Sequence, residues 1–148
     1  METGIEVNKG IERLECKDKY RVLIVDDEMC ILKTLSWIFE TMEFETTLAG
    51  NGFDAFNKFL GEPFDLVITD LNMKGMDGFE LIRKIKQRSP ATPAVLITGE
   101  EPGFLKKREE ENEADLIIFK PFKMKEIEDA VIKMMNIKKG HSSNIVYQ

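Results

Sequence analysis

Acidic, hydroxyl and basic side chains follow four of the apolar segments of this chain. Asp26 and Asp27 follow the first segment, Asp70 the third, Thr98 the fourth and Lys120 the fifth. If these segments are parallel strands of one sheet, their carboxyl ends meet at a single edge, where ligands bind in such folds. The sequence therefore predicts a site that combines three carboxylates, one hydroxyl and one ammonium group.

The charges of this set indicate what the site would bind. Three crowded carboxylates repel one another, which raises their pKa values or requires a cation. Oxygen donors favour a hard ion, and Mg²⁺ suits a site that supplies a few carboxylates and keeps water for a phosphate. Lys120 and Thr98 can contact phosphoryl oxygens. Asp70 follows the central strand, so it is the best candidate for a nucleophile that forms an acyl phosphate.

Each of these residues also has a simpler interpretation. Strands often end in Asp or Thr because these residues begin turns and cap helices. Asp26 or Asp27 could cap the helix that follows it, and Thr98 could cap another. Coincidence accounts easily for one such position, but poorly for five positions on one edge of a sheet.

Alternating strands and helices must position this site. Strands are expected at 21–25, 44–49, 64–69, 94–97 and 116–119, where the runs are short and apolar; helices are expected at 28–42, 53–60, 79–88, briefly within 101–113, and from 127 to about 138, where apolar residues recur at helical spacing. Apolar strands alternating with amphipathic helices indicate an α/β fold with a parallel sheet covered on both faces. Right-handed crossovers with one change of winding direction then give a doubly wound three-layer (βα)5 sandwich.

Composition limits the remaining classes of protein. The 148 residues include 27 acidic and 21 basic side chains, a net charge of −6, which disfavours direct binding of nucleic acid. The apolar runs are too short for a membrane span, residues 1–19 do not form a signal peptide, and Cys16 and Cys30 are not a disulfide framework. We therefore expect one cytoplasmic domain at 20–139, an N-terminal extension at 1–19 and a polar, frayed tail at 140–148.

The chain resembles the receiver domain of two-component response regulators. The resemblance rests on four ordered motifs, which are VLIVDDE at Val22–Glu28, DLVITDLNMKGMDG at Asp65–Gly78, LITG at Leu96–Gly99 and FKPF at Phe119–Phe122. It covers residues 20–139. It implies a flavodoxin-like fold with the strand order 2-1-3-4-5.

The resemblance implies a role for each acid. Asp70 would accept a phosphoryl group from a phosphohistidine, carried by a sensor histidine kinase or a histidine phosphotransfer protein. Asp27 would bind Mg²⁺ directly and Asp26 would help through a water molecule. Asn72 would contribute its backbone carbonyl to the metal, and Asp70 would complete the metal site.

Other positions are assigned by the same resemblance. Thr98 and Lys120 would bind the phosphoryl oxygens and transmit the presence of the group, and the Lys120–Pro121 bond would be cis. Asn72 and Glu100 match the positions at which the family tunes hydrolysis of the acyl phosphate. We therefore expect self-dephosphorylation to be fairly quick.

Two positions depart from the family pattern. Lys74 stands where the loop after the acceptor usually has proline, which would loosen that loop without touching the ligands. Ile117 occupies the position of the usual switch aromatic, Tyr or Phe. Because the standard account couples the movement of the threonine to rotation of that ring, signal readout in this chain must differ or be weaker.

Three functions are compatible with the sequence. The first is a stand-alone phosphorylation switch whose partner docks on the fourth helix, which is acidic, the fifth strand and the fifth helix, which is basic. The second is a Mg²⁺-dependent phosphatase or phosphotransferase with an aspartyl nucleophile, although such enzymes typically have Asp where this chain has Asn72. The third is the receiver part of a larger DNA-binding regulator.

Overall fold

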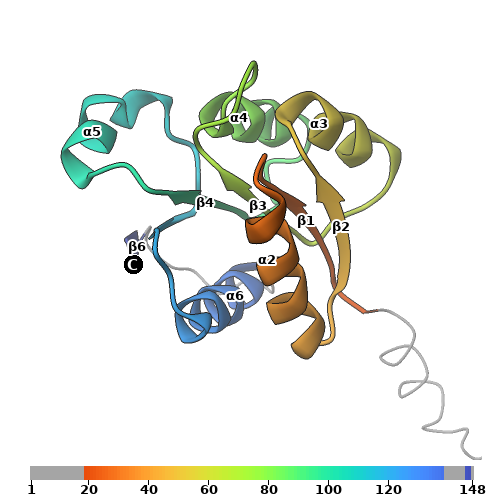
Figure 1. Cartoon of the computed structure of the whole chain (residues 1–148). Helices are drawn as coiled ribbons and strands as arrows, with labels where there is room; N and C mark the ends of the chain where they lie inside the picture. The colour runs from red at the N-terminus through yellow and green to blue at the C-terminus, as the bar shows by residue number, and fades with distance from the viewer. Residues whose placement is uncertain (1–18, 139–145, 148) are drawn as a thin grey trace, which may run out of the picture.

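Strands and helices alternate along the chain, which we describe from a computed structural model over residues 19–138 and 146–147 (Figure 1). The strands are β1 (Arg21–Val25), β2 (Glu45–Ala49), β3 (Leu66–Asp70), β4 (Ala94–Thr98), β5 (Leu116–Phe119) and β6 (Val146–Tyr147). The helices are α2 (Met29–Thr41), α3 (Gly52–Gly61), α4 (Gly78–Arg88), α5 (Pro102–Lys107), the 3-10 turn η1 (Glu109–Glu111) and α6 (Met124–Lys138). Within these residues no helix has both the length and the apolar character needed to cross a membrane.

The sheet has the order β2-β1-β3-β4-β5-β6, and every pair of neighbouring strands is parallel. This confirms the predicted α/β fold with the order 2-1-3-4-5. Val25 pairs with Thr69, Asp70 with Ile97, and Thr98 with Phe119. The register therefore brings the carboxyl ends of the central strands to one edge, as the site hypothesis requires.

The sheet extends beyond the predicted five strands. Val146 pairs with Leu116 and Tyr147 with Ile117, so the expectation of a frayed tail is wrong for these two residues. The backbone groups on the outer edge of β5 would otherwise have no strand partner, and valine and tyrosine favour extended structure. The rest of the expected tail, and the expected extension up to residue 18, lie outside the described residues.

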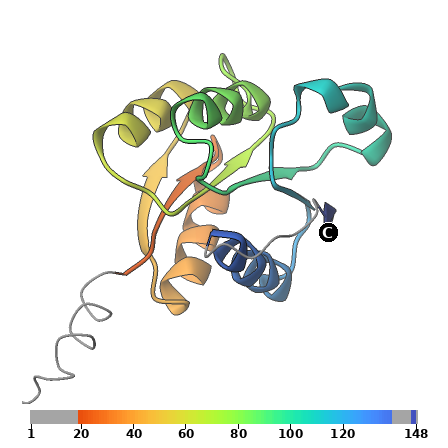
Figure 2. The same cartoon turned by 180° about the vertical axis from the view of Figure 1, so that it is seen from behind.

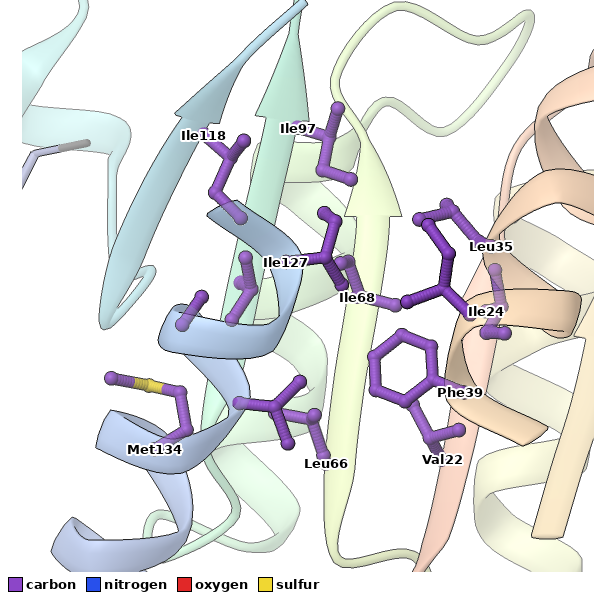
Figure 3. Packing of buried hydrophobic residues seen from close by; sticks show 14 of the residues in the cluster. Val22, Ile24, Leu35, Phe39, Leu66, Ile68, Ile97, Ile118, Ile127 and Met134 are labelled. Atoms are coloured by element: carbon purple, nitrogen blue, oxygen red, sulfur yellow. The ribbon is translucent and has the colours of Figure 1, made fainter. Parts of the chain in front are cut away.

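Helices cover both faces of the sheet, as Figures 1 and 2 show from opposite sides. In β1, Val22 and Ile24 belong to the core shared with α2 and α6, whereas Leu23 and Val25 belong to the core shared with α3 and α4. Figure 3 shows the first core, in which Phe39 packs among aliphatic side chains of the central strands. Because both faces are buried, β1, β3, β4 and β5 are largely apolar and their charged residues lie at the strand ends, whereas the edge strand β2 is polar and only partly buried.

Helix α5 is a short and mostly exposed helix. It has six residues, of which only Leu105 is buried, and it stands away from the sheet (Figure 1). A short helix was expected here because the segment 101–113 is highly charged. Arg108, which directly follows the helix, adds a contact to Asp77 that is described below.

Candidate functional site

The three acids of the predicted site meet at the carboxyl edge of the sheet. Asp26 and Asp27 directly follow β1, and Asp70 is the last residue of β3. One oxygen from each of the three carboxylates can be chosen so that all three lie within 4.8 Å of one another. Such a spacing of oxygen donors, with no nitrogen or sulfur donor among them, fits a hard divalent cation.

Lys120 reaches this cluster from the end of β5. Its Nζ lies 3.0 Å from Oδ1 of Asp70 and 3.3 Å from Oδ2 of Asp26. The backbone N–H of Lys120 donates to the carbonyl of Thr98 over 2.7 Å, and the Lys120–Pro121 bond is cis, as expected. One ammonium group therefore offsets part of the repulsion among the acids.

Burial controls the protonation of the two deeper acids, since Asp26 is 1% and Asp70 is 6% exposed. Burial raises the pKa of Asp26, against the opposing effects of the Glu28 N–H and of Lys120. Burial also raises the pKa of Asp70; the hydrogen bond from Lys120 opposes this rise and the charge of Asp26 adds to it. Burial lowers the pKa of Lys120, but its hydrogen bond to Asp70 and the two negative charges outweigh this, so that pKa stands above its usual value.

Thr98, Asn72 and Glu100 form a second group beside the acceptor. Thr98 is fully buried at the end of β4, and its Oγ1 accepts a hydrogen bond of 2.9 Å from the backbone N–H of Glu100. The Asn72 amide donates to the Glu100 carboxylate, also over 2.9 Å. The loop after β3 is thereby joined to the loop after β4 by these two residues, whose side chains the family resemblance associates with acyl phosphate hydrolysis.

The two departures from the family pattern lie at different depths. Lys74 is exposed in the loop between Asp70 and α4. Ile117 is buried, and together with Phe79, Leu105 and Phe119 it lines a cavity of about 490 Å³ between α5 and the sheet. A branched aliphatic residue in the wall of this cavity therefore occupies the position of the usual switch aromatic.

Arg108 is a residue that the sequence did not single out. It follows α5, and its guanidinium contacts the carboxylates of Asp77 and Glu111 and lies over the ring of Phe79. In the sequence this arginine is one of many charged residues in an acidic segment, and nothing in its spacing distinguishes it. Its partner Asp77 does carry a signal, because an acid before an apolar helical run is typical of an N-cap.

We expect Asp26→Asn to stabilise the metal-free protein by about 1 kcal/mol near neutral pH, because it removes a buried negative charge and, with it, repulsion between the carboxylates. Asparagine still accepts the hydrogen bond of 2.9 Å from the Glu28 N–H. Folding raises the pKa of Asp26 above its ordinary value of 3.8. The protonated Asp26 side chain therefore contributes its full stability below about pH 4, and this contribution is lost as the pH rises through the raised pKa. The advantage of the variant in urea unfolding should therefore grow from about pH 4 to about pH 7.

In saturating Mg²⁺ we expect the wild-type protein to be more stable than Asp26→Asn. A ligand at a hundred times its Kd stabilises the fold by about 2.7 kcal/mol, and the variant has lost one of the acids. Asp129→Asn, an exposed change on α6, is the matched control and should alter stability little at either pH. A metal-free wild-type protein that is more stable than Asp26→Asn at neutral pH would contradict the argument that the buried charge of Asp26 is destabilising.

Comparisons with known proteins agree on the family. The family model described as response regulator receiver domain matches residues 22–132. The chain is 32% identical over 120 residues to sporulation initiation phosphotransferase F of Bacillus subtilis, with 80% of this chain and 95% of that protein covered. It is 37% identical over 83 residues to the transcriptional regulatory protein YesN of Bacillus subtilis, with 54% of this chain covered.

Solved structures and chain lengths complete the comparison. The chemotaxis response regulator CheY4 of Vibrio cholerae superposes with a TM-score of 0.74 at 27% identity, over 79% of this chain and 99% of that one. The chain spans 23% of the length of YesN and less than half of several other regulators that it matches. The matched region includes all the strand ends that form the site. This chain belongs to the response regulator receiver domain family.

Proposed function

We propose that residues 20–139 form a receiver unit that accepts a phosphoryl group on Asp70 from a phosphohistidine of a sensor histidine kinase or histidine phosphotransfer protein. The observation that carries the proposal is the placement of the Asp70 carboxylate, which lies among two further acids and 3.0 Å from the Lys120 ammonium. A nucleophilic oxygen, a cation site and a fixed positive charge thus share one edge of the sheet.

The transfer step needs little chemistry from the protein beyond positioning and charge. One oxygen of the ionised Asp70 forms a bond to phosphorus, while the bond between phosphorus and the imidazole nitrogen breaks and its electron pair stays on the imidazole. Lys120 exchanges its contact with Asp70 for one with a phosphoryl oxygen. The Thr98 hydroxyl accepts a hydrogen bond from the Glu100 N–H in this structure. In the phosphorylated form it would donate a hydrogen bond to a second phosphoryl oxygen.

The residues present fit a magnesium ion. The side chains of Asp26, Asp27 and Asp70 would hold it together with the backbone carbonyl of Asn72, and Asp26 would act through water. When bound, the ion neutralises the charge that gathers on the phosphoryl oxygens. Without it, Lys120 is the cation among the described residues that opposes the repulsion between Asp70 and an incoming phosphate.

Phosphorylation would act by changing the populations of two conformations that present different output surfaces. Contacts from Thr98 and Lys120 to the phosphoryl group exist in one form only, so they favour whichever conformation makes them best. We place the output surface on α5, β5 and α6, with a protein partner in the cytoplasm and not nucleic acid or membrane. The partner is a separate protein if the receiver acts alone, and another domain of the same protein if the receiver is part of a larger regulator.

Acetyl phosphate tests the proposal without a kinase. Incubation with acetyl phosphate and Mg²⁺ should add one phosphoryl group to the intact mass, located on the peptide that contains Asp70. The label should be absent when Mg²⁺ is chelated, and it should decay fairly quickly once the donor is removed. A protein that takes up no phosphoryl group under conditions that preserve acyl phosphates would overturn the proposal.

A further inference from the structure

Helix α5 is tied to the phosphoacceptor region at both of its ends. Its N-terminal end follows directly on the loop 98–101, in which Thr98 and Glu100 are joined by a hydrogen bond. Its C-terminal end is followed directly by Arg108, whose guanidinium contacts Asp77, the N-cap residue of α4. Between the two ends, Leu105 is the only residue of the helix that is buried.

Arg108 makes an unusually complete set of contacts for a surface residue. Its Nη2 lies 3.0 Å from Oδ2 of Asp77 and 2.6 Å from Oε1 of Glu111, and its Nε donates to Oε2 of Glu111 over 3.0 Å. The guanidinium carbon lies 4.7 Å from the ring centre of Phe79 and 5.8 Å from that of Phe104. A planar guanidinium can lie flat on a ring while its fork of N–H donors bridges two carboxylates, a geometry that the compact ammonium group of lysine does not match.

The partner of this arginine belongs to the segment that leads away from the acceptor. Asp77 caps α4, since its Oδ1 accepts a hydrogen bond of 2.9 Å from the Glu80 N–H while its Oδ2 accepts from Arg108. The next residue, Gly78, donates its N–H to the carbonyl of Leu71 over 2.9 Å, and Leu71 directly follows Asp70. The residue after the acceptor is therefore joined by a backbone hydrogen bond to the residue after Asp77, and Asp77 contacts Arg108.

We propose that Arg108 is a latch that fixes the C-terminal end of α5 to α4, so that movement of the loop 98–101 on phosphorylation turns α5 about a fixed point. The inference rests on the proposed function, because the movement it transmits begins at phosphorylated Asp70. It assigns to one ion pair, Arg108 with Asp77, the coupling between the site and the α5 surface.

The cavity beneath α5 explains why a latch is needed. Ile117 forms part of the cavity wall and has no aromatic ring that could follow Thr98 and press on α5. The cavity of about 490 Å³, which is lined by both apolar and polar side chains, leaves room for α5 to shift relative to the sheet. A movement of Thr98 then reaches the outer face of α5 only if the other end of the helix is held.

Amide hydrogen exchange of residues 102–111, measured with and without acetyl phosphate and Mg²⁺, tests the latch. In wild-type protein we expect phosphorylation to change the exchange of this segment. In Arg108→Met, which keeps an apolar stem, exchange without phosphorylation should rise about tenfold and the effect of phosphorylation should disappear. Asp77→Asn keeps the helix cap and loses the ion pair, so it should show the same pattern, and Arg108→Lys should lie between these variants and wild type.

The control and the mass measurement separate the latch from the proposed function. Lys107→Met removes an exposed cation of the same helix that has no ion pair among the described residues, and it should behave as wild type. Phosphoryl uptake at Asp70, followed in the same samples, should be retained in every variant. If phosphorylated Arg108→Met shows the same change in amide exchange of α5 as wild type, the latch is overturned and the proposed function stands. The same holds if phosphorylated wild-type protein shows no change in the exchange of α5. If wild-type protein takes up no phosphoryl group, the proposed function is overturned and the latch with it.

Discussion

Asp70→Asn is expected to lower the rate of phosphoryl uptake from acetyl phosphate by more than about a thousandfold, because it removes the nucleophile. The amide has the shape of the carboxylate and keeps an oxygen at hydrogen-bond distance from Lys120, so the fold and the neighbouring side chains should persist. The amide oxygen is a poor nucleophile towards phosphorus and carries no charge. Intact mass after labelling, together with the rate of phosphate release from acetyl phosphate, measures the loss.

Variants of the other two acids separate the nucleophile from the cation site. Asp27→Asn and Asp26→Asn leave Asp70 in place, so uptake should return in part when the concentration of Mg²⁺ is raised. Asp129→Asn removes an exposed carboxylate on α6 that contacts only Lys125 among the described residues, and uptake should not change. Labelling of Asp70→Asn at the wild-type rate would mean that a different residue is the acceptor.

The same variant addresses the alternative of a phosphatase. An aspartyl phosphatase would turn over phosphomonoesters steadily and would lose this activity on substitution of Asp70. Such enzymes commonly use a second acid two residues after the nucleophile to protonate the leaving group. Here that residue is Asn72, whose amide donates a hydrogen bond to Glu100 and is too weak an acid to protonate a leaving alkoxide. The geometry therefore favours transfer to Asp70 over continuous turnover.

The strands could be predicted well because their burial leaves a strong signature. Leu116–Phe119 is a strand with the expected bounds, and the expected helix from 28 to 42 is shorter by one residue at each end. Asp70 and Thr98 were expected just after their strands and are in fact the last strand residues. These shifts are small because an apolar run identifies a buried strand, whereas its last hydrogen bond depends on the neighbouring strand.

The placement of the candidate site residues at one edge of the sheet could be predicted, but their contacts could not. Parallel topology alone places the ends of β1, β3, β4 and β5 on one edge, which is why the acids, Thr98 and Lys120 were identified together. The choice of Lys120 partners, the hydrogen bond between Asn72 and Glu100, and the pairing of Arg108 with Asp77 depend on distances between loops. No pattern along the chain records such distances. The pairing of Val146 and Tyr147 with β5 is likewise a contact between residues far apart in sequence.

Gly78→Ala is expected to destabilise the protein by about 2–4 kcal/mol, because there is no space for a methyl group at this position. A Cβ at residue 78 would lie 2.4 Å from the carbonyl oxygen of Asp70 and 2.9 Å from Cα of Leu71, both backbone atoms. It would also lie 2.8 Å from Cδ1 of Leu96, a side-chain atom that can rotate away. Relief of the backbone clash must therefore move either α4 or the end of β3. The free energy of unfolding in urea measures the cost.

Gly103→Ala is the matched control, since Gly103 lies in the first turn of α5 with nothing within 4 Å of the added carbon. Alanine is the better helix former by about 1 kcal/mol, so this variant should be as stable as wild type or slightly more stable. Because the clash in Gly78→Ala is with Asp70 itself, the same variant should also take up phosphoryl groups more slowly at temperatures where it is folded. A Gly78→Ala protein with wild-type stability would show that α4 can move away from β3 at little cost, and the close contact between Gly78 and the acceptor would then not fix the position of Asp70.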